Sequence, residues 1–115
     1  MLSRQHRVTR RQFPLVLKVS RPYHSPVVSL RVAMKPGRGL RPTPFAFIVS
    51  HKVAAKAVDR NKLKRRARAI VRELLPKIKD NYACLLFFKK EARDLSYQEL
   101  KKVIYDLLYL SSIIL

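Results

Sequence analysis

Larger apolar residues alternate with smaller or polar ones along one short stretch of the chain. From Val28 to Met34 every second residue is a larger apolar one, with smaller or polar residues between them. This period of two predicts a strand with one face in the core. A second strand is predicted over 45–50, the stretch FAFIVS. The segment KPGRGLRPTP between them holds both glycines of the chain and predicts a loop or hairpin, so the two strands could pair as antiparallel neighbours.

A helical period of apolar residues marks other stretches. The first helix is predicted roughly over Thr9–Val19, with Thr9 as its cap and Pro14 near the first turn, although Pro14 could equally break it. A longer helix is predicted to open at Asp59, as N-cap, and to end before Pro76. Its amphipathic pattern indicates a helix that packs on a sheet.

The rest of the chain predicts one more strand and one more helix. YACLLFFKK is apolar until Lys89, which is typical of a strand buried on both faces. Ser96 with Glu99 three residues later is a capping box. The apolar stripe of the helix that follows consists of Tyr97, Leu100, Ile104, Leu107 and Leu108. The order helix, strands, helix, strand, helix predicts one α+β domain over 1–115, with 1–8 and 110–115 as possibly flexible ends.

Charge then indicates the kind of partner. The 115 residues include 26 Lys and Arg against 7 Asp and Glu, a formal net charge of +19. No fold requires such an excess, and self-repulsion opposes compaction. We therefore expect a polyanionic partner, with nucleic acid as the first interpretation and an anionic membrane surface as the second.

Other features narrow the class of protein. The N-terminal stretch has no apolar run of signal-peptide length. VIYDLLYLSSIIL is interrupted by polar residues and is shorter than the roughly 20 residues that a spanning helix needs. Cys84 is the single cysteine, so neither a disulfide framework nor a cysteine zinc site is expected, and the prediction is a soluble intracellular protein.

The stretch DRNKLKRRARAIVREL carries the most informative pattern. Placed at 100° intervals, its apolar residues gather on one side: Leu63, Ala67, Ile70, Val71 and Leu74. A ridge lies opposite them, made of Asn61, Arg65, Arg68 and Arg72, flanked by Lys62, Lys64 and Arg66. The planar guanidinium fork suits phosphate oxygens. An ordinary solvated helix is the alternative, but it predicts Glu partners at i+4, and the only acids here are Asp59 and Glu73.

These residues also resemble a known family. KVAAKAVDRNKLKRRAR is similar to the basic motif of bacterial ribonuclease P protein subunits, matching it at Lys52, Ala57, Val58, Arg60, Asn61, Lys62, Leu63, Lys64, Arg65 and Arg68. RVTRRQFPLVLK resembles the N-terminal arm and first helix of that family. FAFIVSHK and YACLLFFKKEARDLSYQELKKVIYDLL resemble its later segments, so the resemblance extends over almost the whole chain.

The resemblance implies a function in transfer RNA processing. Ribonuclease P removes the 5′ leader of precursor transfer RNA, and in bacteria its RNA subunit carries the active site and the Mg²⁺ ions. The protein, one copy per RNA in the bacterial cytoplasm, would bind that RNA and the leader, with neither DNA nor membrane as partner. The implied fold is an α/β sandwich with a left-handed βαβ crossover through the basic helix, against the right-handed default.

The resemblance also assigns site residues. The RNA-binding set would be Lys52, Arg60, Asn61, Lys62, Lys64, Arg65 and Arg68, to which the ridge adds Arg72. Phe13 and Leu17 would line a cleft for the leader, with Arg31 as a weaker candidate, on the physical basis of base stacking; Phe13 could instead be a core residue. The chain departs from the family pattern at Ala46, His51 and Leu17, and in its apolar C-terminus. Leu17 weakens the idea of two stacked aromatic residues.

The residues themselves indicate no catalytic or metal site in the protein. The acids Asp59, Glu73, Asp80, Glu91, Asp94, Glu99 and Asp106 are not adjacent, whereas hydrolysis would need a carboxylate cluster or an acid–base pair. His6, His24 and His51 lack metal-ligand spacing, and no cofactor is expected. Two other classes remain as alternatives: a basic ribosomal or structural RNA-binding protein, and a helix-turn-helix DNA binder, which would need a second helix just before the basic one.

Overall fold

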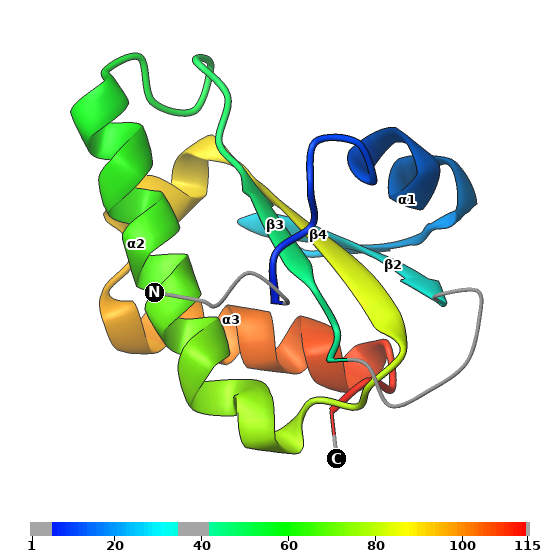
Figure 1. Cartoon of the computed structure of the whole chain (residues 1–115). Coiled ribbons are helices and arrows are strands. Elements are labelled where there is room, and N and C mark those ends of the chain that lie inside the picture. Colours follow the sequence, from blue (N-terminus) through cyan, green and yellow to red (C-terminus); the bar gives the residue numbers. More distant parts are fainter. Residues whose placement is uncertain (1–5, 35–41, 115) are drawn as a thin grey trace.

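The computed structural model describes residues 6–34 and 42–114. Within these ranges the chain forms α1 (Phe13–Val19), β1 (Arg21–His24), β2 (Val28–Met34), β3 (Phe45–Ile48), α2 (Ala57–Leu74), β4 (Tyr82–Phe88) and α3 (Tyr97–Leu110), with short 3-10 helices η2 (Leu75–Lys77) and η3 (Lys90–Asp94). The α+β class and the helix–strands–helix–strand–helix order are confirmed (Figure 1).

The four strands form one mixed sheet in the order β1-β2-β4-β3. β2 pairs antiparallel with both β1 and β4, and β3 pairs parallel with β4. The expected antiparallel pairing of β2 with β3 is therefore wrong, because β4 lies between them. The sequence of β4 is almost wholly apolar. Its central position in the sheet allows both of its faces to be covered.

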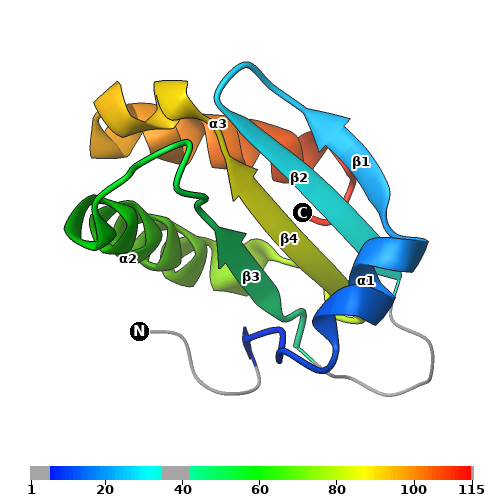
Figure 2. The same cartoon turned by 90° about the horizontal axis from the view of Figure 1, so that it is seen from above.

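Two layers of helices cover the sheet. α1 lies on one face, and α2 and α3 lie together on the other (Figure 1). Viewed from the α1 face with β3 and β4 pointing upward, β4 lies to the right of β3 while α2, which connects them, lies behind (Figure 2). The β3–α2–β4 crossover is thus left-handed, the exception to the usual rule.

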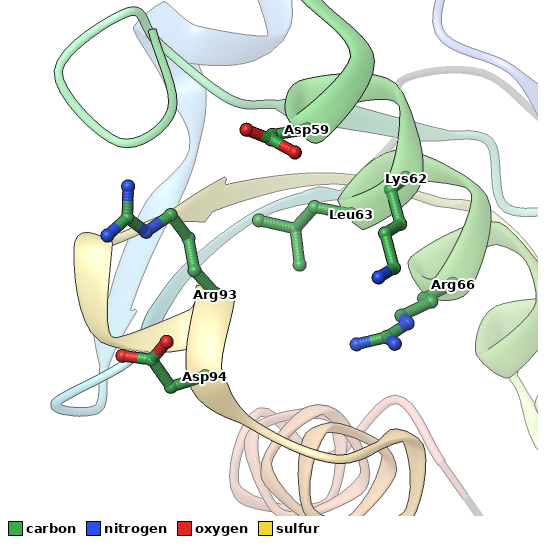
Figure 3. A pocket seen from close by; sticks show the side chains of 6 residues that line it. All are labelled: Asp59, Lys62, Leu63, Arg66, Arg93 and Asp94. Atoms are coloured by element: carbon green, nitrogen blue, oxygen red, sulfur yellow. The ribbon is translucent and has the colours of Figure 1, made fainter. Parts of the chain in front are cut away.

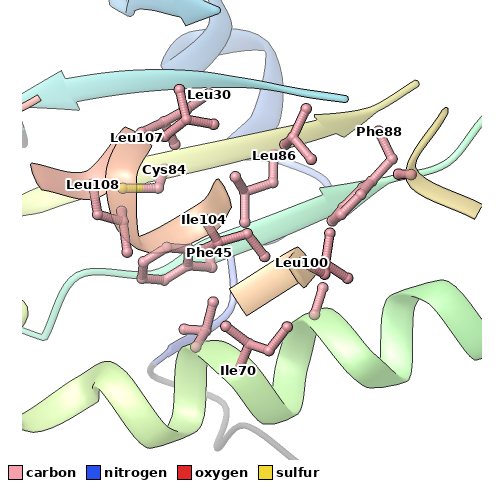
Figure 4. Packing of buried hydrophobic residues seen from close by; sticks show 14 of the residues in the cluster. Leu30, Phe45, Ile70, Cys84, Leu86, Phe88, Leu100, Ile104, Leu107 and Leu108 are labelled. Carbon is pink, nitrogen blue, oxygen red and sulfur yellow. The ribbon is translucent and has the colours of Figure 1, made fainter. Parts of the chain in front are cut away.

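The core fills the space between the sheet and the pair α2 and α3. Leu30, Phe45, Leu86, Ile70 and Leu108 are all fully or almost fully buried there (Figure 4). Burying one such side chain contributes about 1.5–3 kcal/mol. α2 is therefore fixed along its whole inner face, which leaves its other faces for contacts with a partner.

The two ends of the described chain are held in different ways, the first by a bridge to β3 and the last by packing in the core. Arg7 bridges to Phe45, and Ile114 bridges to Ile78. Ile113 and Ile114 are buried, with 0% and 5% of their surfaces exposed. Residues 113 and 114, expected within a possibly flexible end, thus complete the apolar core beneath the sheet.

Several element boundaries differ from those that the sequence predicts. Thr9 caps a turn rather than α1: its Oγ1 accepts from Gln12 N and its N–H donates to Gln12 Oε1, so the helix begins only at Phe13. α2 begins two residues before Asp59, whose carboxylate sits in the first turn instead of at the cap, still at the positive end of the helix dipole.

One strand has no counterpart among the sequence predictions. β1 has the sequence RPYH and is exposed apart from half-buried Tyr23, so it shows no alternation of apolar residues. As an edge strand it tolerates Pro22. The capping box, in contrast, is confirmed: Ser96 Oγ accepts from Glu99 N, and Glu99 Oε1 accepts from Ser96 N.

Candidate RNA-binding surfaces

The inner face of α2 agrees with the helical pattern. Its buried residues are Leu63, Ala67, Ile70, Val71 and Leu74, the five that the 100° spacing places on one side. The rotation of α2 about its own axis is therefore fixed. This rotation also sets the side of the helix from which each cationic side chain projects. This surface divides into an outer ridge and two flanks.

The outer ridge of α2 consists of Asn61, Arg65, Arg68 and Arg72. Asn61, Arg65 and Arg72 are exposed, and Arg68 is half-buried. An open groove of about 610 Å³ runs along Arg65, Arg68 and Arg72, and is also lined by Ala69 and Glu73. Three arginines thus line one groove, and the planar guanidinium group can form paired hydrogen bonds to anionic oxygens.

One residue of the outer ridge, Arg68, contacts a side chain of β3. The Arg68 guanidinium carbon lies 6.0 Å from the centroid of the Phe47 ring, at the outer limit of a cation–π contact. Lys64, one turn before Arg68, is half-buried. This contact accounts for the lower exposure of Arg68 relative to the other ridge arginines.

Arg60 holds the chain that precedes α2. Its Nη1 donates to the carbonyl oxygens of Ala54 and Ala55 at 2.9 and 2.8 Å, and lies 3.3 Å from His51 Nδ1. Lys52 is exposed within the turn that Arg60 braces. Among the residues that the motif marks, Arg60 thus has a structural task that the sequence alone did not reveal.

The cations of α2 are not neutralised within the described part of the chain. Its ion pairs are Lys101 with Glu73 at 2.6 Å and Lys102 with Asp106 at 3.4 Å. Glu73, the acid at the end of α2, is thus paired with α3. It also accepts from the Tyr97 hydroxyl, and these two hydrogen bonds, with Lys101 first, lower the pKa of Glu73.

A second candidate surface lies on the opposite face of the sheet, beside α1. Phe13 meets Phe87 edge-on, with ring centroids 6.4 Å apart and planes at 64°. In the strand register Phe87 is flanked by Ser29 and Ile48, which share its face. We call Phe13, Leu17, Ile48 and Phe87 the α1-side patch. Leu17 is 38% exposed, and the other three are half-buried.

Arg31 forms hydrogen bonds that hold the C-terminal end of α1. Its Nε donates to Ser20 Oγ at 2.7 Å and its Nη2 donates to the Ser20 carbonyl at 3.2 Å. Ser20 is the residue at the C-terminal end of α1, so Arg31 fixes this helix against β2.

Phe87 and Ile48 are residues of the α1-side patch that the sequence did not predict. Their position in apolar strand runs gave no sign that they are only half-buried.

A separate apolar groove of about 530 Å³ lies on another side of α1. Its apolar lining residues are Leu15, Val16, Val19, Ala33, Met34, Pro44 and Ala83. Gln12 and Lys18 complete the lining. Phe13 and Leu17 are not among its lining residues. The groove is therefore distinct from the α1-side patch.

Chemical groups for catalysis are not gathered in the described ranges. Over 6–34 and 42–114 no three His, Cys, Asp or Glu residues are grouped to hold a metal ion. Cys84 is fully buried in β4, and burial raises the pKa of its thiol far above the ordinary value. An inert core cysteine is the consequence, since only the thiolate is reactive.

Comparison with known proteins decides the family. A model of the family Ribonuclease P matches residues 2–110. The chain belongs to the ribonuclease P protein family. It is 34% identical over 113 residues to the ribonuclease P protein component of Microcystis aeruginosa, covering 95% of this chain and 92% of that one. The component from Pseudanabaena is 35% identical, with 87% and 85% covered.

Solved structures of the family share the fold. The Staphylococcus aureus RNase P protein superposes with a TM-score of 0.82 at 16% identity, over 96% of this chain and 98% of that one. The Thermotoga maritima protein gives 0.78 at 21% identity, over 89% and 94%. In the described part of this chain no helix is long and apolar enough to cross a membrane.

Family membership settles the general function. The chain is the protein component of a ribonucleoprotein endoribonuclease that acts in transfer RNA processing, and the RNA component carries catalysis. The interpretation as a ribosomal or other structural RNA-binding protein is not favoured. A helix-turn-helix arrangement is also wrong, because β3 and a turn, not a helix, precede α2.

Proposed function

We propose that the outer ridge of α2 binds the ribonuclease P RNA and that the α1-side patch binds the 5′ leader of precursor transfer RNA. The observation that carries the first part is the lack of carboxylate partners for the ridge arginines within the described residues. Phosphates supply the missing negative charge, and release of their counterions drives the association.

The second part rests on the chemistry of the α1-side patch. Phe13 and Phe87 present aromatic rings that are not fully buried, and Leu17 of the same patch is 38% exposed. Bases of a single strand stack on such surfaces without sequence preference, which suits leaders that differ among precursors. Because α1 and α2 lie on opposite faces of the sheet (Figure 1), one protein molecule can hold both RNAs at once.

Under this proposal the protein assists a reaction that another molecule performs. The protein positions the leader and offsets phosphate repulsion between the two RNAs. Mg²⁺ serves the RNA component, and the protein binds no cofactor of its own. One protein joins one RNA in the bacterial cytoplasm, and neither DNA nor a membrane is a partner.

Site-directed hydroxyl-radical cleavage tests the proposal. Cys84 is fully buried, so a reagent attached to one introduced cysteine marks a single place on the surface. From Arg72→Cys on the ridge we expect cuts in the ribonuclease P RNA. From Leu17→Cys we expect cuts in the leader. Gln98→Cys, on the exposed side of α3, is the matched control and should cut neither RNA strongly.

Two outcomes would overturn the proposal. Leader cuts from Arg72→Cys with none from Leu17→Cys would exchange the roles of the two faces. Equal weak cutting from all three positions would mean that neither surface faces RNA.

A further inference from the structure

A cavity of about 350 Å³ lies between the first turns of α2 and the 3-10 helix η3. Its lining residues are Asp59, Lys62, Leu63, Arg66, Arg93 and Asp94 (Figure 3). This space is on the flank of α2 that faces η3 and α3, away from β3. It belongs neither to the outer ridge nor to the α1-side patch.

Two cations of α2 occupy one wall of this cavity. Lys62 and Arg66 are four residues apart, so they stand on the same side of the helix. In Figure 3 the Lys62 amine points toward the Arg66 guanidinium, and both reach into the space below Leu63. Like charges at this spacing destabilise a helix by a few tenths of a kcal/mol, which a bound anion between them would reverse.

The surrounding acids do not neutralise this pair. No carboxylate oxygen of the described residues lies within 4.0 Å of a nitrogen of Lys62, Arg66 or Arg93, since the ion pairs there involve other lysines. The Asp94 carboxylate turns away from the heads of Lys62 and Arg66 (Figure 3). The two cations therefore have no negative partner in the described part of the chain.

Arg66 is held in place before any ligand arrives. Its Nη1 donates to the Leu95 carbonyl at 3.2 Å, and the side chain is half-buried. This bond ties α2 to the segment between η3 and α3 and uses one of the five guanidinium donors. A guanidinium fixed in this way loses little freedom when it binds a phosphate oxygen.

The charge of the lining selects the class of ligand. Three cationic side chains against two acidic ones leave one net positive charge in the cavity. A phosphodiester group carries one negative charge and matches it, whereas a polyphosphate would bring excess charge close to Asp59. The hydrophobic floor is a single residue, Leu63, which is 4% exposed, so an extended apolar ligand has little to contact.

We propose that this cavity binds one phosphodiester group of an RNA strand through Lys62 and Arg66 on α2, while Arg93 on η3, which points toward Asp59 at the far wall (Figure 3), adds positive charge at a greater distance. The inference rests on the proposed function, and it adds a phosphate site that continues the RNA-binding surface from the ridge around α2. Arg66 and Arg93 are outside the set that the family motif marks. The strand would thus be held from two sides of the same helix.

Salt-dependent binding to a bacterial ribonuclease P RNA tests this site. Lys62→Gln should weaken binding roughly three- to tenfold and lower the slope of log K against log salt by about 1. Arg93→Gln removes the more distant charge and should lower both the affinity and the slope by a smaller amount. Lys90→Gln, on the exposed part of η3 outside the cavity, is the matched control and should change the slope by less than half as much as Lys62→Gln. Thermal melting confirms that each variant folds.

A substitution of opposite sign separates binding from structural damage. Asp59→Asn removes a negative charge from the lining, so binding to the RNA should tighten by roughly twofold, even though the loss of a helix-dipole contact lowers stability slightly. Weaker binding by Asp59→Asn, or an unchanged salt slope in folded Lys62→Gln, would overturn the proposal.

Two further measurements identify the source of the phosphate and show which proposal a negative result refutes. If inorganic phosphate raises the melting temperature through Lys62 while the RNA slope stays unchanged, the cavity binds free phosphate and the RNA assignment is wrong. Arg65→Gln on the outer ridge is measured beside them. A lower slope for Arg65→Gln alone would refute the cavity site only, whereas no change in any variant would refute the proposed function as well.

Discussion

The Nη1 atom of Arg60 lies 2.9 Å from the carbonyl oxygen of Ala54 and donates a hydrogen bond to it. A second bond from the same atom reaches the Ala55 carbonyl. Together they join the first turn of α2 to the segment that follows β3, where Val53 N and Ala54 N also bond to the Ser50 carbonyl. Arg60 is thereby a brace for the turn that presents Lys52.

Arg60→Gln should therefore destabilise the fold. The loss of charge-assisted bonds to two carbonyls is expected to lower the free energy of unfolding by roughly 1–3 kcal/mol. Urea denaturation followed by circular dichroism measures this quantity. Arg65→Gln, at an exposed position of the same helix, serves as the control and should stay within about 0.5 kcal/mol of the parent chain. Equal stability of the two variants would show that Arg60 does not brace this turn.

The outer ridge predicts a change in salt dependence. Replacing Arg65 and Arg68 by Ala should weaken binding to the ribonuclease P RNA and lower the slope of log K against log salt by about 2, since each lost phosphate contact contributes nearly 1. Filter binding over a range of salt concentrations gives the slope. Folded variants with the parent slope would show that the ridge does not face RNA.

Phe13 predicts a difference between two substrates. Phe13→Ala should weaken binding of precursor transfer RNA by about 1–3 kcal/mol, the value of one stacked base, and should hardly affect mature transfer RNA, which lacks a leader. Leu15→Ala is the control, because Leu15 lies in the separate apolar groove and is 66% exposed. Equal loss for both RNAs, together with a much lower melting temperature, would assign Phe13 to the core instead.

Glu73 predicts a dependence of stability on pH. Hydrogen bonds from Lys101 and then Tyr97 lower its pKa below the ordinary 4.5. A carboxyl whose folded pKa is depressed stabilises the fold above its unfolded pKa, and this contribution is lost as the pH falls through the folded value. The difference in unfolding free energy between the parent chain and Glu73→Gln should therefore be constant at neutral pH and shrink below about pH 4.5. A difference that does not change with pH in urea titrations would contradict this role.

Local patterns predicted the elements that bury regular apolar stripes. The five inner residues of α2, the apolar strand β4 and the Ser96–Glu99 capping box are each encoded within a few consecutive residues. The spacing also identified the outer ridge, because the residues opposite a buried stripe must face outward.

Non-local features were beyond this reading. The insertion of β4 between β2 and β3 depends on pairing between segments far apart in sequence, and the left-handed crossover was expected only from the family resemblance. The bond from Arg60 to Ala54 and the position of Arg93 opposite Arg66 arise from the folded path of the chain. The structure shows that residues alike in charge have different tasks: Arg60 and Arg31 hold backbone, whereas Arg65 and Arg72 are exposed.

The central position of β4 has a consequence during synthesis on the ribosome. The basic helix α2 precedes β4 in the chain, so it emerges from the exit tunnel before the strand that joins β2 to β3 has been made. Until then β1 and β2 can form only an isolated hairpin, which is marginally stable in water. The nascent chain thus exposes its polycationic segment next to ribosomal RNA while it is still unfolded, and its folding is completed only after residues 113 and 114 have followed.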